Sequence, residues 1–185
     1  MHLIVGLGNP GPRYEQSRHN LGYATIDFLA GLLHAQQPAR KFGSLYADVR
    51  IDHEKLVLVQ PLTYMNRSGL AVTEFLGYYS LLPEKLILIY DDLDLPPGCI
   101  RIRRGGGSAG HRGVQSVIDS LGTTDFIRLR IGIGKPPQEM DVADYVLAKV
   151  SGDEKVLLNQ AVIRAAEAVQ VVVRQGLDIA MNNFN

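Results

Sequence analysis

The sequence predicts one α/β domain with three layers, α/β/α, in which helices cover both faces of a twisted, mixed but mostly parallel sheet. Two short apolar runs, residues 3–5 and 86–90, have the length and composition of buried strands. Segments with apolar residues three or four positions apart alternate with such runs, as in parallel sheets whose strands are joined by helices. At 185 residues, without a repeat or a linker, the chain is expected to form a single domain over residues 1–185.

The first half of the chain is expected to contain a strand, a helix, an antiparallel hairpin and a second helix. These elements occupy residues 3–5, 21–35, 46–51 with 55–61, and 63–79. Gly6 begins a turn rich in glycine and proline, where the first strand has to end, and Pro38 ends the first helix. The two strands of the hairpin surround a short polar turn, which predicts that they pair with each other.

The second half is expected to contain a strand that runs into Asp91, an arginine-rich strand, a glycine-rich loop followed by a helix, another strand and a long helix. These elements occupy residues 86–90, 100–103, 105–113 with a helix to 121, 127–133, and 151–176. Ser151 and Glu154 have the spacing of a capping box, and Gly176 is a suitable end for the helix they begin. No stretch predicts a signal peptide or a membrane-spanning segment.

Positive charge is unevenly distributed, although 19 Lys and Arg residues balance 19 Asp and Glu residues. Residues 95–118 and 126–138 contain no acid, but the first stretch has four arginines and the second has two arginines and a lysine. Along residues 127–133, Arg128 and Arg130 alternate with apolar or small residues, so both are expected on one face of a strand. A basic face on a protein of zero net charge predicts a partner that carries phosphate.

Several kinds of chemistry have no support in the sequence. The single cysteine, Cys99, cannot form an internal disulfide and has no nucleophile signature around it, which fits a reducing cytoplasm. Gly6, Gly8 and Gly11 match the spacing of a dinucleotide-binding loop, but prolines on both sides of Gly11 prevent the helix that this loop requires. The ligand spacings of common metal sites are missing, so neither a metal nor a cofactor is expected.

Polar side chains follow the predicted strand ends at Gly6, Pro61 and Asp91. Because the carboxyl ends of parallel strands meet at one edge of a sheet, this edge is expected to gather Asn9, His19, Asn66, Asp91 and His111. A neutral imidazole beside an aspartate suits general-base activation of water, and amides can donate to a developing oxyanion. Taken alone, His19 could equally be a histidine of a loop with no catalytic role. The glycines before His111 could equally form a flexible connector.

A family resemblance is carried by five segments, GLGNPGPRYEQSRHNLGY, PLTYMNRSG, DDLDLPPG, GGGSAGHRG and RLRIGIGKP. They follow one another between residues 5 and 136, and in this order they resemble the bacterial peptidyl-tRNA hydrolases. That family hydrolyses the ester that joins a peptide to the 3′-terminal ribose of tRNA. The resemblance implies a similar fold, a cytoplasmic monomer, peptidyl-tRNA as the partner, and no metal, cofactor or membrane.

The resemblance also implies roles for the residues that match the family pattern. His19 would be the catalytic base, and Asp91 would orient its ring. Asn9 and Asn66 would hold the peptide backbone and the reacting carbonyl group. Contacts with the peptide or the tRNA are implied for eight further residues: Tyr14, Asn20, Tyr64, Met65, Arg103, His111, Arg112 and Arg130.

Three arginines in that group have a particular place in the pattern. Arg103 and Arg130 occupy the positions that are associated with the 5′-phosphate of tRNA, and they belong to the basic stretches found from charge alone. Arg112 departs from the pattern, because the family commonly has Asn after the histidine. His111 itself is expected to line the channel beside the catalytic residues.

A function of another class stays open, namely an RNA-binding protein on the same fold without hydrolysis, similar to the chloroplast splicing factors related to this family. The chain retains the amides, the histidine and the aspartate of the hydrolase pattern. A binding module has no need of an intact base and orienting acid, so their presence favours the hydrolase.

Overall fold

Seven strands form one mixed sheet, in the order β2-β3-β4-β1-β5-β7-β6, in the computed structural model, which describes residues 1–185. The central strands β4, β1, β5 and β7 run parallel, whereas β3, β2 and β6 pair antiparallel at the two edges. The predicted mixed, mostly parallel sheet is therefore confirmed. The strands are β1 (His2–Gly6), β2 (Ala39–Lys41), β3 (Ser44–Ile51), β4 (Glu54–Pro61), β5 (Leu86–Asp92), β6 (Ile100–Arg104) and β7 (Ile127–Gly132).

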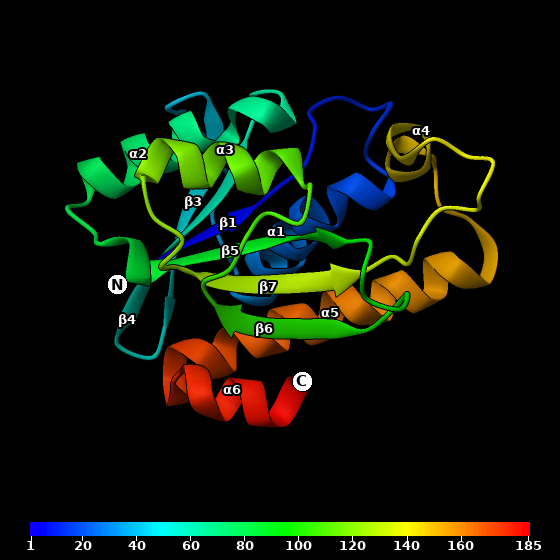
Figure 1. The fold of residues 1–185 in the computed structure, drawn as a ribbon. Helices are drawn as coiled ribbons and strands as arrows, with labels where there is room; N and C mark the ends of the chain where they lie inside the picture. Colours follow the sequence, from blue (N-terminus) through cyan, green and yellow to red (C-terminus); the bar gives the residue numbers. More distant parts are fainter.

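Helices cover both faces of this sheet, which confirms the three-layer prediction. The α-helices are α1 (Leu21–Leu32), α2 (Ser68–Tyr78), α3 (Arg112–Leu121), α4 (Val142–Leu147), α5 (Gly152–Gln175) and α6 (Leu177–Phe184). Three short 3₁₀ helices are η1 (Arg18–Asn20), η2 (Met65–Arg67) and η3 (Pro83–Lys85). Figure 1 shows α2 and α3 on one face, α1, α5 and α6 on the other, and α4 beyond the arrowhead of β7.

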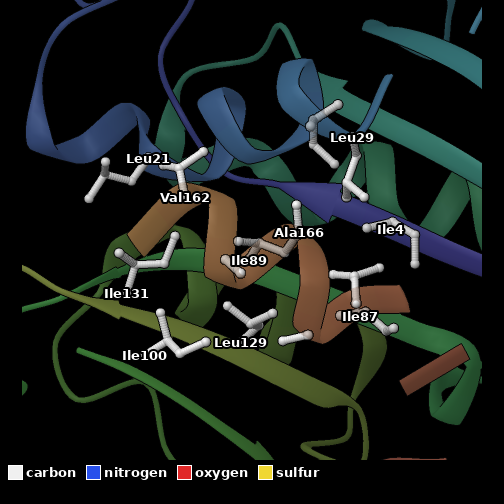
Figure 2. Close-up of a cluster of buried hydrophobic side chains, with 14 of the residues drawn as sticks. Ile4, Leu21, Leu29, Ile87, Ile89, Ile100, Leu129, Ile131, Val162 and Ala166 are labelled. Carbon is white, nitrogen blue, oxygen red and sulfur yellow. The ribbon is translucent and has the colours of Figure 1, made fainter. Parts of the chain in front are cut away.

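Apolar side chains fill the space on both sides of the sheet. Along β5, Ile87 and Ile89 face α1 and α5, whereas Leu88 faces α2 and α3. Figure 2 shows the first of these clusters, where Ile89 of the sheet lies near Val162 and Ala166 of α5. Because both faces are covered, the central strands need no polar side, which explains the continuous apolar runs in the sequence.

By length and composition alone, α5 could cross a membrane, which was not expected. It has 24 residues, and its most apolar window has a mean hydropathy of 1.4. No segment of this kind was expected from the sequence, and by these two criteria that prediction was wrong. The apolar side of α5 is packed into the core, where it buries Leu158, Ala161, Val162, Ala165, Ala166, Ala168, Val169 and Val172. Its hydropathy is thus accounted for by burial against the sheet.

Other local predictions also need correction. The helix predicted over residues 63–79 begins only at Ser68, since the preceding residues form η2. Ser151 does precede α5, but its side chain makes no capping hydrogen bond. Glu154 instead binds Arg18 of η1, with carboxylate oxygens 2.7 and 2.6 Å from the guanidinium Nε and Nη2. Three elements were not predicted from the sequence, namely β2, α4 and α6, and each is eight residues or shorter.

Two glycines allow α1 to pack closely against the sheet. Gly6 ends β1, and Gly22 lies in the first turn of α1. A side chain on Gly6 would overlap the carbonyl of Gly22, and one on Gly22 would overlap the backbone of Leu7 and Ile89. Because His19 lies three residues before Gly22, this close approach determines how near His19 comes to the end of β5.

Replacing Gly22 by alanine is expected to lower the free energy of unfolding by about 1–3 kcal/mol, the usual effect of overpacking a dense region. Gly31→Ala is the matched control in the same helix, since a methyl group there meets open space. It should leave stability unchanged or raise it by up to about 1 kcal/mol, because alanine restricts the unfolded chain. Urea denaturation measures both changes, and equal effects would contradict the packing argument.

Candidate active site

A cavity of about 860 Å³ opens at the carboxyl edge of the parallel strands, where the loops after β1, β4 and β5 meet. Its lining includes all five residues expected to gather at this edge. Of the wider set predicted for the site, the lining contains Asn9, Tyr14, His19, Tyr64, Met65, Asn66, Asp91, His111 and Arg112. The remaining predicted residues, Asn20, Arg103 and Arg130, are not part of this lining.

The carboxylate of Asp91 lies between two histidines. Its Oδ1 is 2.8 Å from Nδ1 of His19, in η1, and 3.1 Å from Nε2 of His111, which precedes α3. Nδ1 of His111 accepts hydrogen bonds from the amides of Gly113 and Val114, at 3.1 and 3.3 Å, so the ring proton belongs on Nε2. Both histidines therefore donate to Asp91, and neutral His19 keeps a free lone pair on its own Nε2.

The surroundings of Asp91 keep its carboxylate ionised. Burial by itself would raise the pKa of this group, which is 2% exposed, but the positive charge that His19 and His111 carry when protonated, together with their hydrogen bonds, outweighs burial. The pKa of Asp91 consequently lies well below its ordinary value. A carboxylate that stays ionised holds His19 in one tautomer and stabilises the imidazolium when the ring takes up a proton.

The side-chain amide of Asn9 is oriented by its neighbours. Its Oδ1 accepts a hydrogen bond from the backbone N–H of Met65 at 3.3 Å, which leaves the Nδ2 group available to a ligand. Asn20 holds the backbone of Asn9, because its Oδ1 accepts from the Asn9 N–H at 2.8 Å and its Nδ2 donates to the Asn9 carbonyl at 2.9 Å. The structure therefore places Asn20, which is buried, behind Asn9 and outside the cavity lining.

Arg18 holds the segment that carries His19. Its guanidinium pairs with Glu154 of α5, donates to the carbonyl of Tyr145 at 3.0 Å, and lies 4.1 Å from the centre of the Tyr145 ring. These contacts connect η1 to α4 and α5. Arg18 was not among the residues predicted for the site, and Glu154 was assigned to a capping box instead of to this ion pair. The only signal was that Arg18 immediately precedes His19.

His19, Asp91 and His111 also form the one cluster whose ligand atoms are close enough to hold a metal ion, within 4.8 Å of one another. The two amide hydrogen bonds to His111 oppose this use, because they place the proton on the nitrogen nearest Asp91. A metal ion bound to Nε2 of His111 would have to displace the proton on that nitrogen. Nδ1 could not take up this proton while it accepts the two amide hydrogen bonds of α3. A site without metal remains our prediction.

A model of the peptidyl-tRNA hydrolase family matches residues 3–185. The chain belongs to this family. Relatives named peptidyl-tRNA hydrolase include those of Geobacillus thermodenitrificans and Syntrophomonas wolfei, which are 48% and 44% identical over the full length of both chains. The crystal structure of peptidyl-tRNA hydrolase from Acinetobacter baumannii has a TM-score of 0.94 at 38% identity, and the match covers 100% of this chain and 94% of that one.

Membership of the peptidyl-tRNA hydrolase family makes the protein a hydrolase, as the sequence resemblance implied. None of these relatives supports the alternative of a non-catalytic RNA-binding protein. A more distant likeness, to purine nucleoside phosphorylase from Toxoplasma gondii, has a TM-score of 0.56 at 10% identity over 98% of this chain and 92% of that one. It concerns the fold alone.

Four arginines of β6 and β7 lie on the α3 side of the sheet, outside the lining of the cavity: Arg101, Arg103, Arg128 and Arg130. Arg103 is exposed, and Arg130 donates through Nε to Asp92 at 2.5 Å. Arg128 is fully buried, and its Nη1 donates to the carbonyl of Gly107. The expectation that Arg128 belongs to an exposed basic face is therefore wrong, because the glycine-rich loop receives its side chain.

Three side chains at the rim of the cavity make no hydrogen bond or ion pair within the hydrolase. They are Tyr64, which is 72% exposed, and the exposed side chains of Asn66 and Arg112. Arg112 is the first residue of α3, where the helix dipole disfavours a cation. Its charge is thus more easily satisfied by an external anion than by its own helix.

One side of the cavity is an apolar wall that was not predicted from the sequence. This wall combines a residue after β5 with residues of α4, namely Leu93, Val142, Val146 and Leu147. Asp141 begins α4 by accepting a hydrogen bond from the amide of Ala143 at 2.7 Å. An acid at Asp141 followed by Asp144 three residues later is a weak capping signal that could have indicated this short helix.

The depressed pKa of Asp91 predicts how the stability of the hydrolase depends on pH. In the unfolded chain an aspartate has a pKa of about 3.9, so ionised Asp91 contributes stability above about pH 4 that is lost as the pH falls toward the lower folded value. Below about pH 4, the free energy of unfolding of the wild type should therefore fall more steeply than that of Asp91→Asn. Urea denaturation at a series of pH values measures this, and parallel curves would contradict the depressed pKa.

Proposed function

We propose that this cavity hydrolyses the ester bond between a peptide and the 3′-terminal ribose of tRNA, using a water molecule that His19 activates. The observation that carries the proposal is the geometry at Asp91, which uses Nδ1 of His19 and leaves Nε2 unprotonated. The family supports peptidyl-tRNA as the substrate. N-blocked aminoacyl-tRNA, which carries the same ester, belongs to the same substrate class.

The chemical steps follow from the free groups at this edge of the sheet. Nε2 of His19 takes a proton from water while the water oxygen attacks the ester carbonyl. The Nδ2 group of Asn9 and the side-chain amide of Asn66 donate hydrogen bonds to the peptide and to the carbonyl oxygen as it gains negative charge. The bond to the ribose oxygen then breaks, and this oxygen receives the proton from the His19 imidazolium. Asp91 stays ionised and holds the ring throughout.

The products are a peptide with a free carboxylate and a tRNA with a free terminal hydroxyl group. We propose that the apolar wall of the cavity receives peptide side chains, because pockets for organic ligands are mostly apolar with a few polar groups. The other predicted contacts with the peptide or the 3′ end come from Tyr14, Tyr64, Met65 and His111. Arg112 is proposed to contact a phosphate or ribose near the 3′ end, since its charge is unpaired.

Arg103 and Arg130 are proposed to hold the 5′-phosphate of the tRNA. The side chain of Arg103 is exposed and makes no ion pair. Asp92 fixes Arg130 through Nε, which leaves the two Nη groups for an anion. The two residues lie on adjacent strands and on the same face of the sheet, because they are diagonal neighbours in the β6–β7 pair.

We propose further that the enzyme acts as a cytoplasmic monomer without metal or cofactor and needs no membrane. One chain supplies the histidine, the aspartate and both amides of the cavity. Cys99 is a free thiol on the surface, which suits a reducing compartment. The tautomer of His111 supports the absence of a metal, as argued above.

His19→Ala tests the assignment of the base. With N-acetylaminoacyl-tRNA as substrate and EDTA present, turnover should fall about 10²–10⁴-fold, the usual loss when a general base is removed. The fold and the affinity for tRNA should be retained, because the side chain of His19 lies at the cavity surface and its loss opens no hole in the core.

His53→Ala is the matched control, since His53 is an exposed histidine in the turn between β3 and β4. It should keep wild-type turnover. Near-wild-type turnover of His19→Ala would mean that another group is the base. Cleavage by the wild type that EDTA abolishes would contradict a mechanism without metal.

Arg103→Gln tests the phosphate contact. Loss of this charge should weaken binding of peptidyl-tRNA and reduce the slope of log K against log salt by about one, whereas turnover of a short ester that mimics the CCA end should not fall. Arg103 is a cleaner target than Arg130, whose removal would leave the buried Asp92 unpaired. Arg104→Gln is the control, because Arg104 pairs with Asp125 and Glu84. Equal losses on tRNA and on the short ester would contradict the assignment.

A further inference from the structure

Arg128 is a buried cation that the hydrolytic mechanism does not use. Its side chain is fully buried, and the guanidinium lies 4.7 Å from the centre of the Phe126 ring. Nη1 donates to the carbonyl of Gly107 at 2.5 Å, but Nε and Nη2 are buried without any hydrogen-bond partner. An arginine with two unused buried donors is uncommon, because each costs its full desolvation energy.

No carboxylate compensates the charge of Arg128. Burial lowers the pKa of its guanidinium, the side chain of Tyr90 opposes this shift, and the charges of Arg103 and Arg130 lower the pKa further. Arg103, Arg128 and Arg130 form a cluster of three arginines, and Asp92 is already paired with Arg130. Arginine keeps its proton in proteins, so the cluster retains an uncompensated positive charge. Unfavourable arrangements of this kind tend to be kept where function needs them.

The same loop contacts two of these arginines. Arg103 and Arg128 are directly opposite each other in the β6–β7 pair, so their side chains leave the sheet on one face. The guanidinium of Arg103 lies against Gly106, where any side chain would collide with it, and Arg128 holds the carbonyl of Gly107. The φ angle of +107° at Gly106 is one that other residues rarely adopt. Both arginines therefore determine the path of the loop.

This loop leads directly to the catalytic carboxylate. Four residues after Gly107 comes His111, which donates to Asp91 through Nε2 and accepts two amides of α3 through Nδ1. A displacement of the loop would therefore move a hydrogen-bond donor of Asp91. Asp91 in turn orients His19, so the loop connects the arginines to the base over a short length of chain.

We propose that Arg128 is a positioning residue, which links a tRNA phosphate bound by Arg103 to the placement of His111 and Asp91. The phosphate supplies the negative charge that the cluster lacks, and the hydrogen bond from Arg128 to Gly107 keeps the loop in place when this charge is present. Without the phosphate, repulsion between Arg103 and Arg128 favours a loop in which His111 is less well held. The inference rests on the proposed contact between Arg103 and the tRNA phosphate.

Kinetics on two forms of one substrate test this link. Wild type and Arg128→Met are compared on N-acetylaminoacyl-tRNA with a 5′-phosphate and on the same tRNA after its removal. For the wild type, loss of the phosphate should raise KM and also lower kcat, on the order of tenfold for a modest misplacement of catalytic groups. For Arg128→Met, kcat should be low and equal on both substrates, whereas the difference in KM should remain, because Arg103 and Arg130 still bind the phosphate.

Three further variants distinguish a positioning role of Arg128 from a role in binding the phosphate and from a role in folding. Arg103→Gln should lose the difference in KM, and Arg104→Gln should behave as the wild type. Arg128→Lys, which keeps the charge without the fork of donors, should recover part of the difference in kcat. The proposal is overturned if Arg128→Met lowers kcat by one factor on both tRNA forms and on the short ester, or if wild-type kcat does not depend on the phosphate.

A measurement of stability tests the same inference without turnover. Inorganic phosphate should raise the Tm of the wild type more than chloride does at equal ionic strength. Arg128→Met should have an equal or higher Tm without phosphate, since it removes a buried uncompensated charge, and should respond less to phosphate. A wild type that phosphate does not stabilise overturns the proposal, even if Arg128→Met fails to fold. If phosphate stabilises the wild type but the protein cleaves no ester, the proposed hydrolysis is wrong, whereas the binding of phosphate by the arginines is supported.

Discussion

The hydrogen bonds that His19 and His111 donate to one oxygen of Asp91 are the interaction on which the catalytic arrangement depends. Burial opposes the charge of this carboxylate, and the two rings together overcome it. His111 can donate only because two amides of α3 occupy its other nitrogen. The tautomer of His19, and with it the basic Nε2, therefore follows from the position of a helix that His19 does not belong to.

The two neighbouring acids at the end of β5 serve two different sites. Asp91 binds the histidines of the cavity, whereas Asp92 binds Arg130 on the side of the sheet where the arginines gather. Successive residues of a strand point to opposite faces, so one short segment can supply both an orienting acid and a counterion. The acid that orients His19 and the acid that pairs with Arg130 are therefore adjacent in the chain but lie on opposite faces of the sheet.

Much of the site was predictable because its signals are local in the chain. Apolar runs identified the strands that carry Gly6 and Asp91, and the glycine-rich turn and loop marked where Asn9 and His111 had to lie. The pair of Arg18 and Glu154 was not predictable, because 136 positions separate the two residues and each had a plausible local explanation. Arg128 was misplaced for a related reason: alternation along a strand defines a face, but it does not say what covers that face.

The sequence by itself determined the order of the longer strands and helices, the edge of the sheet where polar residues collect, and the family pattern. Each of these depends on residue type and on spacing along the chain. The tertiary structure alone decided the proton on His111, the free end of the Asn9 amide, the burial of Asn20, and which arginine has a counterion. These properties depend on donors and acceptors within about 3 Å of one another, the distance of a hydrogen bond. Most of these atoms come from segments far apart in sequence, so only the folded chain brings them together. The amides that bind Nδ1 of His111 are only two and three residues away, but they converge on it only because α3 begins there.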